Sequence, residues 1–229
     1  MKYAVITDVH SNVFALEAAL KEIDKMRPDK IICLGDIVGN GFYPEETASM
    51  IRSRGDILCV KGNHDIFVTM DLKNFSEADP RLKVFRWQQK VLSSASKKFL
   101  SELPLTLRFK DGNFCVTAFH YPQTPKGRFK DMKYLPSKDD LLRLFGDQTG
   151  DVFFFGHEHT GSLGRIGNKY YLNFGTLGNF LHENEARFGF VEIDGNKVAY
   201  KPIIVQYDDS LAKKSTAKLN EILQGKYYK

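Results

Sequence analysis

The amino-acid sequence predicts an α/β protein in which a parallel β-sheet, built by the first third of the chain, packs against a second sheet built by the last third. Apolar strand-like runs alternate with helical patterns in the first third, an order typical of parallel strands joined by crossover helices. Strand-like runs separated by glycine-containing turns fill the last third. With 229 residues, 42% of them hydrophobic, the chain can bury a core without disulfide bonds.

The first third contains three predicted strands and two predicted helices. Residues 14–26 have apolar side chains at helical spacing, and residues 44–54 begin with proline and precede Gly55, as helices often do. Ligands bind at the carboxyl ends of the strands in such sheets. Polar motifs follow the three strands directly, so we expect one shared site at that edge. The strands are KYAVIT, KIICLG and DILCVKG, and the motifs are TDVHSN, GDIVGN and GNHD.

The rest of the chain predicts further helices and a strand-rich end. Residues 77–100 are expected to be helical, as are residues 138–145 and the segment after residue 207. The runs on either side of Asp111-Gly112 predict a β-hairpin. Five later runs are expected to form strands of the second sheet: DVFFFG, SLGRI, KYYLNF, RFGFVEID and KVAYKPIIV.

The bulk properties predict a soluble, cytoplasmic, single-domain protein. We expect one domain over residues 1–229, with candidate lid or rim segments at 67–103 and 121–136. The net charge of +5 favours anionic partners weakly, because a basic surface that serves only solubility is commoner. No signal peptide or membrane-spanning run is visible, so no membrane contact is expected. Three cysteines lie in apolar runs and fit core positions in a reducing compartment: Cys33, Cys59 and Cys115.

Histidines gather at the ends of predicted strands. A single histidine in such a place is usually structural, but five placed alike indicate a site. His182 is the exception, because it lies in a loop, and both a structural and a substrate-side role remain open for it. The five are His10, His64, His120, His157 and His159.

Pairs of candidate ligands are spaced two residues apart. On an extended chain, Asp8 and His10 would share one face and could grip one cation together. The same argument applies to His157 and His159. Asp36, at the end of the second strand, could bridge two metal ions because a carboxylate has two oxygen atoms.

The tetrapeptide Gly62-Asn63-His64-Asp65 combines several candidate roles. Asn63 offers a neutral carbonyl oxygen to a metal. His64 could face the substrate, with Asp65 orienting it through a ring nitrogen. Glu158, between two histidines, is expected to point away from the site as a surface acid or as a supporting group.

Together these donors comprise four imidazoles, two carboxylates and one amide oxygen, without a thiolate. Such a set suits Mn, Fe, Zn, Co or Ni ions better than Ca²⁺. With one aspartate shared, it could hold two ions about 3.5–4 Å apart. The predicted metal ligands are Asp8, His10, Asp36, Asn63, His120, His157 and His159.

The series D-x-H, GD, GNHD, a histidine after a strand and GHEH resembles the calcineurin-like metallophosphoesterase superfamily, especially its small prokaryotic-type single-domain members. The resemblance covers residues 8–159 and implies a four-layer α-β-β-α fold of two facing mixed β-sheets flanked by helices. It implies that Asp36 bridges two ions, that His64 lies at the scissile phosphate, and that Asn12 contacts substrate or a supporting group. It assigns Asp8, His10 and His159 to one ion and Asn63, His120 and His157 to the other.

Two stretches depart from the pattern of the superfamily. Thr160-Gly161 follows the last histidine where proline is common, and Asn173-Phe174-Gly175-Thr176 replaces a later Asn-Pro-Gly-Ser-like turn. We expect neither stretch to touch a ligand, and we expect both to reshape the rim of the site.

The sequence therefore predicts a dinuclear metal-dependent phosphoesterase acting on phosphodiesters or phosphomonoesters. A metal-bridging hydroxide would attack phosphorus, and His64, oriented by Asp65 or a backbone carbonyl, would stabilise the transition state or protonate the leaving group. Lys126 and Arg128, in a basic and aromatic loop, are expected to bind the phosphate of a small phosphate ester or nucleotide; the alternative is a solvated loop. A nuclease is less favoured because no long basic stripe is visible, and a metal-bound non-catalytic scaffold is a further alternative.

Overall fold

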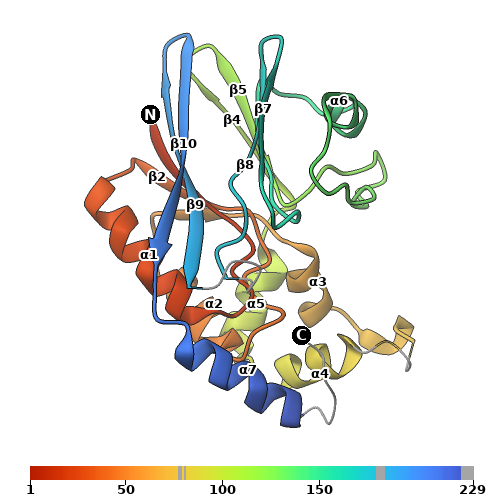
Figure 1. Cartoon of the computed structure of the whole chain (residues 1–229). Helices are drawn as coiled ribbons and strands as arrows, with labels where there is room; N and C mark the ends of the chain where they lie inside the picture. Colours follow the sequence, from red (N-terminus) through yellow and green to blue (C-terminus); the bar gives the residue numbers. More distant parts are fainter. Residues whose placement is uncertain (77–78, 80, 179–183, 223–229) are drawn as a thin grey trace.

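The structure is a computed structural model that describes residues 1–76, 79, 81–178 and 184–222 (Figure 1). Two five-stranded mixed sheets face each other, and helices cover their outer faces. This arrangement confirms the predicted four-layer fold. Within the described residues, no helix has both the length and the apolar character that crossing a membrane requires.

The first sheet has the strand order β10-β9-β1-β2-β3. Strands β1, β2 and β3 are parallel and are connected by α1 and α2, as predicted. The last two strands were expected in the second sheet, but β9 instead pairs antiparallel with β1 and β10 with β9. The elements are β1 (Lys2–Ile6), α1 (Val13–Met26), β2 (Lys30–Cys33), α2 (Pro44–Ser53), β3 (Ile57–Cys59), β9 (Glu185–Asp194) and β10 (Lys197–Gln206).

The second sheet has the order β4-β5-β6-β8-β7 and begins in the middle of the chain. The predicted hairpin supplies β4 and β5, and β5, β6 and β8 are parallel. Helix α6 covers the outer face, and its N-cap Ser137 accepts a hydrogen bond from the Asp140 backbone N–H. The elements are β4 (Thr106–Asp111), β5 (Phe114–Phe119), α6 (Lys138–Phe145), β6 (Val152–Phe154), β7 (Ser162–Ile166) and β8 (Lys169–Asn173).

The helix expected over residues 77–100 is two helices, because Ser93 caps a new one. Its hydroxyl accepts a hydrogen bond from the Ser96 backbone N–H at 3.1 Å, and its own N–H and hydroxyl donate to Glu45. The cap ends one helix at Val91 and starts the next at Ser94. The elements are α3 (Asn63–Thr69), the 3₁₀ turn η1 (Leu72–Asn74), α4 (Arg81–Val91), α5 (Ser94–Glu102) and the C-terminal α7 (Ser210–Ile222).

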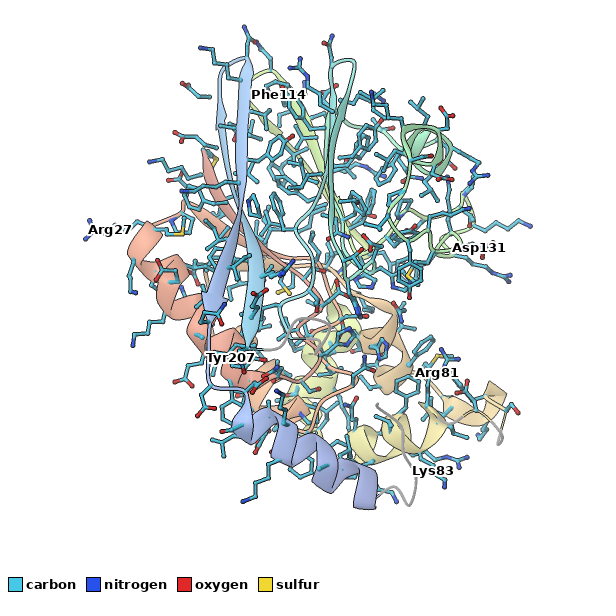
Figure 2. All side chains as sticks on the ribbon, viewed as in Figure 1. Arg27, Arg81, Lys83, Phe114, Asp131 and Tyr207 are labelled. Carbon is cyan, nitrogen blue, oxygen red and sulfur yellow. The ribbon has the colours of Figure 1, made fainter. Side chains whose placement is uncertain are left out.

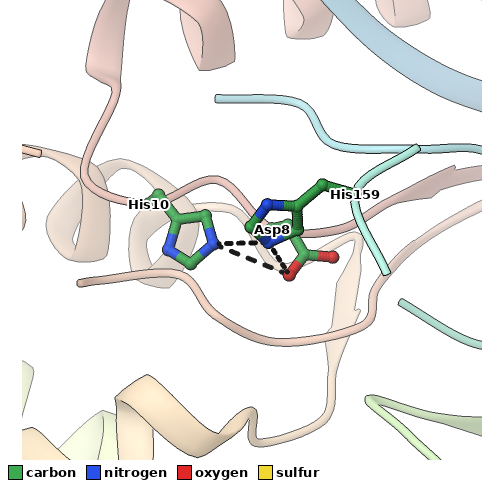
Figure 3. A group of neighbouring side chains, drawn as sticks. All are labelled: Asp8, His10 and His159. Atoms are coloured by element: carbon green, nitrogen blue, oxygen red, sulfur yellow. Dashed lines mark hydrogen bonds and ion pairs between the residues drawn. The ribbon is translucent and has the colours of Figure 1, made fainter. Parts of the chain in front are cut away.

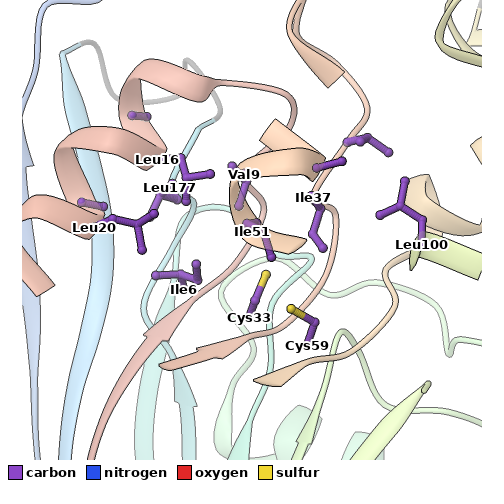
Figure 4. Packing of buried hydrophobic residues seen from close by; sticks show 14 of the residues in the cluster. Ile6, Val9, Leu16, Leu20, Cys33, Ile37, Ile51, Cys59, Leu100 and Leu177 are labelled. Carbon is purple, nitrogen blue, oxygen red and sulfur yellow. The ribbon is translucent and has the colours of Figure 1, made fainter. Parts of the chain in front are cut away.

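Three apolar clusters hold the layers together. Figure 2 shows side chains filling the space between the two sheets. One lies between the first sheet and its helices and includes Ile6, Leu16 and Cys33 (Figure 4). A second fills the space between the sheets, and a third joins the second sheet to α6. This packing fixes the carboxyl ends of the parallel strands of both sheets, from which the polar motifs extend.

Candidate metal centre

Four of the candidate ligands lie in loops that turn sharply at the strand ends. The backbone φ angles are 53° at Asp8, 50° at His10, 50° at Asp36 and 71° at His157, all in the left-handed region that residues other than glycine rarely adopt. These segments are therefore not extended, and the argument from alternating faces was wrong. Asp8 and His10 still converge, whereas His157 and His159 lie in two different groups of donors. Such conformations persist only where surrounding contacts enforce them, and they cluster at functional sites.

Backbone hydrogen bonds between the loops enforce these conformations. The Asp8 N–H donates to the Gly35 carbonyl at 3.1 Å, and the His10 N–H donates to the Asp36 carbonyl at 2.9 Å. Gly35 and Gly62 allow the loops after β2 and β3 to touch, because a Cβ atom at either glycine would collide with the other loop. The loops thus form one rigid unit.

Asp8, His10 and His159 form the first cluster of donors (Figure 3). The Nε2 atoms of His10 and His159 are 3.0 Å apart, and Asp8 Oδ1 lies 3.2 Å from His159 Nε2 and 3.7 Å from His10 Nε2. The second Asp8 oxygen, Oδ2, accepts hydrogen bonds from Thr7 Oγ1 and the His157 N–H. Those bonds leave Oδ1 directed at the imidazoles.

His120 is at the centre of the second cluster. Its Nε2 lies 3.0 Å from Asn63 Oδ1, 3.2 Å from His157 Nδ1 and 3.4 Å from Asp36 Oδ2. Its Nδ1 lies 2.8 Å from the Leu34 carbonyl oxygen, which can only accept, so Nδ1 carries a proton and donates. A backbone partner of this kind orients a ring so that its other nitrogen can bind a metal.

Asp36 lies between the two clusters. Its Oδ2 is 3.8 Å from His10 Nε2 in the first cluster and 3.4 Å from His120 Nε2 in the second. Its Oδ1 accepts from the His64 backbone N–H at 2.9 Å. One carboxylate oxygen therefore faces donors of both clusters, which places Asp36 where a bridging ligand would stand.

The donor set fits a pair of cations. Asp8 Oδ1 and His10 Nδ1 are buried and have no hydrogen bond assigned within the described part of the chain. Asp8 Oδ1 faces the imidazoles of His159 and His10 at 3.2 and 3.7 Å, and a buried carboxylate is costly unless its charge is compensated. A cation would satisfy Asp8 Oδ1. Imidazoles, carboxylates and an amide oxygen without a thiolate match transition-metal ions.

The charges within the site are strongly coupled. Burial lowers the pKa of His10 to about 3 and that of His157 to about 4, so both rings are neutral and able to bind a metal at pH 7. Burial also opposes a charge on His120, but the carboxylates of Asp36 and Asp8 outweigh it and raise the pKa to about 9. The pKa of Asp36 stays well below its usual value, because neighbouring histidines outweigh the effect of burial.

Asp65 does not orient His64, contrary to the sequence-based prediction. Its two oxygens accept hydrogen bonds from the backbone N–H groups of Ile37, Val38 and Gly62 at 2.9–3.2 Å. Asp65 thereby ties the loop that carries Asp36 to the start of α3. His64 Nδ1 is buried, and no described residue accepts or donates a hydrogen bond there.

His64 packs among aromatic rings beside His10 and Asp36. Its ring centroid lies 5.0 Å from that of His10, 5.5 Å from that of Phe85 and 6.1 Å from that of Phe67. Burial lowers the pKa of His64, so the ring is neutral at pH 7. It can therefore offer an N–H donor to a group bound at the clusters.

Two polar residues near the ligands have supporting contacts. Asn12 caps α1 by accepting from the Ala15 N–H, and its amide donates to the Gly178 carbonyl and the Tyr207 hydroxyl. Of the two roles expected for Asn12, these contacts favour the supporting one, and substrate contact stays a prediction. Glu158 is fully buried rather than at the surface, and it accepts from the Thr160 N–H.

The turn at residues 173–176 was expected to avoid the ligands, and this was wrong. The Thr176 hydroxyl donates to the Asp8 carbonyl at 2.8 Å, and its backbone N–H donates to the His159 carbonyl at 3.2 Å. The Asn173 amide donates to the Glu158 carbonyl at 2.8 Å. The turn therefore supports both loops of the first cluster, a role that its sequence departure did not reveal.

The basic loop at 121–136 lies beside the second cluster. The ring centroid of Phe129 is 5.8 Å from that of His120, and that of Tyr121 is 5.1 Å from that of His157. Lys126 and Arg128 are exposed, which suits both a substrate-binding role and a solvated loop, and no contact joins them to the clusters among the described residues. His182, for which two roles were open, lies outside the described residues.

Comparison with known proteins places this geometry in a family. The family model described as the calcineurin-like phosphoesterase superfamily domain matches residues 1–196. An uncharacterised protein of Methanocaldococcus jannaschii is 35% identical over 161 residues, which cover 68% of this chain and 61% of that protein. The chain thus spans about three fifths of the length of this relative.

Solved structures share the fold. A hypothetical protein of Pyrococcus horikoshii has a TM-score of 0.81 at 20% identity, covering 96% of this chain and 93% of that one. A metallophosphoesterase of Sphaerobacter thermophilus has a TM-score of 0.73 at 24% identity, covering 97% of both chains. With the family model matching most of its length, the chain belongs to the calcineurin-like phosphoesterase superfamily.

Proposed function

We propose that this protein is a dinuclear metal-dependent phosphoesterase that hydrolyses phosphodiester or phosphomonoester bonds of small or nucleotide substrates. Asp8, His10 and His159 would hold one ion, and Asn63, His120 and His157 the other. The observation that carries the proposal is the position of Asp36, whose Oδ2 faces Nε2 of His10 at 3.8 Å and Nε2 of His120 at 3.4 Å.

The metal ions would supply Lewis acidity, lowering the pKa of a water molecule to about 7 and neutralising charge on the phosphoryl oxygens. The chain's own residues contribute position and proton control. Thr7 and the His157 N–H hold Asp8 Oδ2, so that Oδ1 stays directed at the first cluster. The Leu34 carbonyl holds His120 with Nε2 directed at the second.

His64 would assist the leaving group as a hydrogen-bond donor. Its ring packs against that of His10, and burial keeps it neutral. A neutral imidazole has one N–H, which could donate to the leaving oxygen as negative charge develops on it. The aromatic packing, rather than Asp65, would set the orientation of the ring.

The test is a turnover assay on protein of known metal content. Metal-free protein and protein loaded with Mn²⁺ are compared on bis-p-nitrophenyl phosphate and p-nitrophenyl phosphate. We expect hydrolysis only in the loaded sample, with about two ions bound per chain. A fully loaded sample that hydrolyses neither ester would reject catalysis and favour the non-catalytic scaffold.

Nucleic acid is a second candidate substrate: although the sequence has no long basic stripe, one segment beside His64 concentrates positive charge. Residues 81–102 contain six Lys or Arg and one Glu, so this stretch holds a net charge of +5, which equals that of the whole chain. The stretch forms α4 and α5, and Phe85 of α4 touches His64. A clustered positive charge favours polyanion binding. Degradation of single-stranded DNA or RNA oligonucleotides by the loaded protein tests this, and protein active only on the small esters would exclude it.

A further inference from the structure

Gln88 of α4 is buried in a position where an apolar residue would ordinarily be expected. It is fully inaccessible, and the neighbouring buried residues of its helix, Val84 and Phe85, are apolar. Its Oε1 has no hydrogen-bond partner among the described residues. A buried amide with an unpaired oxygen destabilises a fold. We therefore expect the hydrogen bonds of the amide nitrogen, Nε2, to offset that cost.

The amide nitrogen of Gln88 contacts a loop of the metal centre. Gln88 Nε2 donates to the Gly39 carbonyl and lies 3.4 Å from both the Gly41 carbonyl oxygen and Ser11 Oγ. Because both carbonyls can only accept, Nε2 must face them and Oε1 must face away. Ser11 Oγ also donates to the Gly39 carbonyl, at 3.3 Å. The Gly39 carbonyl is therefore held by two donors, one from α4 and one from the residue after His10.

The backbone of Gly39 packs against the rings of two histidines of the site. Its φ angle is 120°, and a Cβ atom at this position would stand 2.5 Å from His64 Nδ1 and 3.0 Å from His10 Nδ1. The two rings are packed edge to face with their centroids 5.0 Å apart. A shift of the Gly39 backbone would move both rings, because neither Nδ1 atom has a hydrogen-bond partner among the described residues that could hold it.

We propose that Gln88 is a positioning residue that fixes the His10 and His64 rings through the Gly39–Gly41 loop. It makes α4 part of the support of the metal centre. Only the prediction about turnover, given below, rests on the proposed function. The placement of the two rings is a property of the folded chain and can be measured without metal or substrate.

Gln89 provides a matched control. It stands next to Gln88 in the same helix, and its Nε2 also donates to a backbone carbonyl, that of Met70 at the end of α3, at 2.9 Å. Gln88→Met and Gln89→Met each remove one amide and keep the length of the side chain. Only Gln88→Met should disturb the histidines.

The first measurement uses metal-free protein. Histidine side-chain NMR spectra should show displaced signals for His10 and His64 in Gln88→Met, and wild-type signals in Gln89→Met. Unchanged His10 and His64 signals in a folded Gln88→Met variant would overturn the proposal, whether or not the protein hydrolyses any ester. If Gln88→Met does not fold, Ser11→Ala removes the other donor to the Gly39 carbonyl and should displace the same two signals by less.

The second measurement follows metal binding and turnover. A residue that supports metal ligands typically changes affinity by about 10-fold or more, so Gln88→Met should bind Mn²⁺ about 10-fold more weakly than Gln89→Met in competition with a chelator. At saturating metal, kcat should fall about 10-fold while KM changes little, because His64 would be misplaced at the leaving group. Equal affinity and equal kcat in the two folded variants would overturn the proposal. Absence of turnover in every variant, with the affinity difference present, would reject the proposed function and leave the positioning role standing.

Discussion

The loops after β1, β2 and β3 differ sharply from the loop at 121–136, although both regions border the second cluster. The first three are buried, adopt left-handed backbone at Asp8 and Asp36, and are joined by hydrogen bonds from residues distant in sequence, including Thr176. The second region carries Lys126 and Arg128 on its exposed surface. Atoms that bind a cation must be positioned to within tenths of an ångström, so they need rigid surroundings. Charges that attract a phosphate act over longer distances and do not.

Replacing a buried ligand should therefore have the largest effect. We expect Asp36→Ala to lose metal binding, because it removes the carboxylate between the clusters, and to lower kcat/KM about 10³-fold or more. Metal analysis after dialysis and the ester assay measure both quantities. A variant that retained two ions and its activity would show that Asp36 does not bridge them.

His64→Ala should separate catalysis from metal binding. The variant is expected to keep wild-type metal content and to lose about 10²-fold in kcat. The loss should be largest for alkyl esters, whose leaving groups need a proton donor most. Wild-type turnover of an alkyl phosphodiester by this variant would exclude the leaving-group role.

Metal affinity should rise with pH between 7 and 9. The pKa of His120 is about 9 in the metal-free protein, because the Asp36 and Asp8 carboxylates outweigh its burial. Metal binding at Nε2 must displace a proton below that pH, so apparent affinity should increase about 50-fold between pH 7 and 9 and level off above pH 9. Calorimetry in buffers of different ionisation enthalpy counts the released proton. An affinity that stays constant between pH 7 and 9 would contradict the assigned charge.

Asp65→Ala tests the hydrogen bonds that hold the loops of the site together, rather than the reaction itself. Three backbone N–H groups would lose their acceptor, so we expect the free energy of unfolding of the metal-free protein to fall by about 2 kcal/mol. Urea denaturation measures it. If Asp65 instead oriented His64, the variant would match His64→Ala in kcat and keep wild-type stability.

The smallest effect is expected on the exposed loop. The double change Lys126→Ala and Arg128→Ala should raise KM up to about fivefold and leave kcat unchanged, because exposed charges interact weakly. Lys197→Ala, at the start of the edge strand β10, is the control for a lost surface charge. A large fall in kcat in the double variant would show that the loop at 121–136 helps to position the reacting groups, as the buried loops do.

The sequence predicted what depends on local pattern. The parallel strands, the hairpin around Asp111-Gly112 and the helix at 138–145 follow from apolar spacing and turn residues, and the structure contains each of them. The break before α5 also had a local signal, in the Ser-Ser-Ala-Ser run whose first serine, Ser93, became the cap.

The remaining features depend on contacts between distant residues. Nothing near β9 indicates that it pairs with β1 rather than with β8, because strand partners are chosen by the packing of the whole sheet. The roles of Asp65 and Gln88 depend on backbone groups in other loops. The left-handed turns at Asp8 and His157 could not be predicted from the sequence, because most Asp and His residues have negative φ angles.

The placement of β9 beside β1, with β10 outside it, determines where the chain can be cut. The two strands pair over ten residues, from Glu185 to Asp194 and from Lys197 to Gln206. A fragment ending at residue 196 would expose the long edge of β9, whose unpaired N–H and C=O groups would recruit a second copy and favour aggregation. A fragment ending before residue 185 would expose β1 itself, the strand that leads into Asp8.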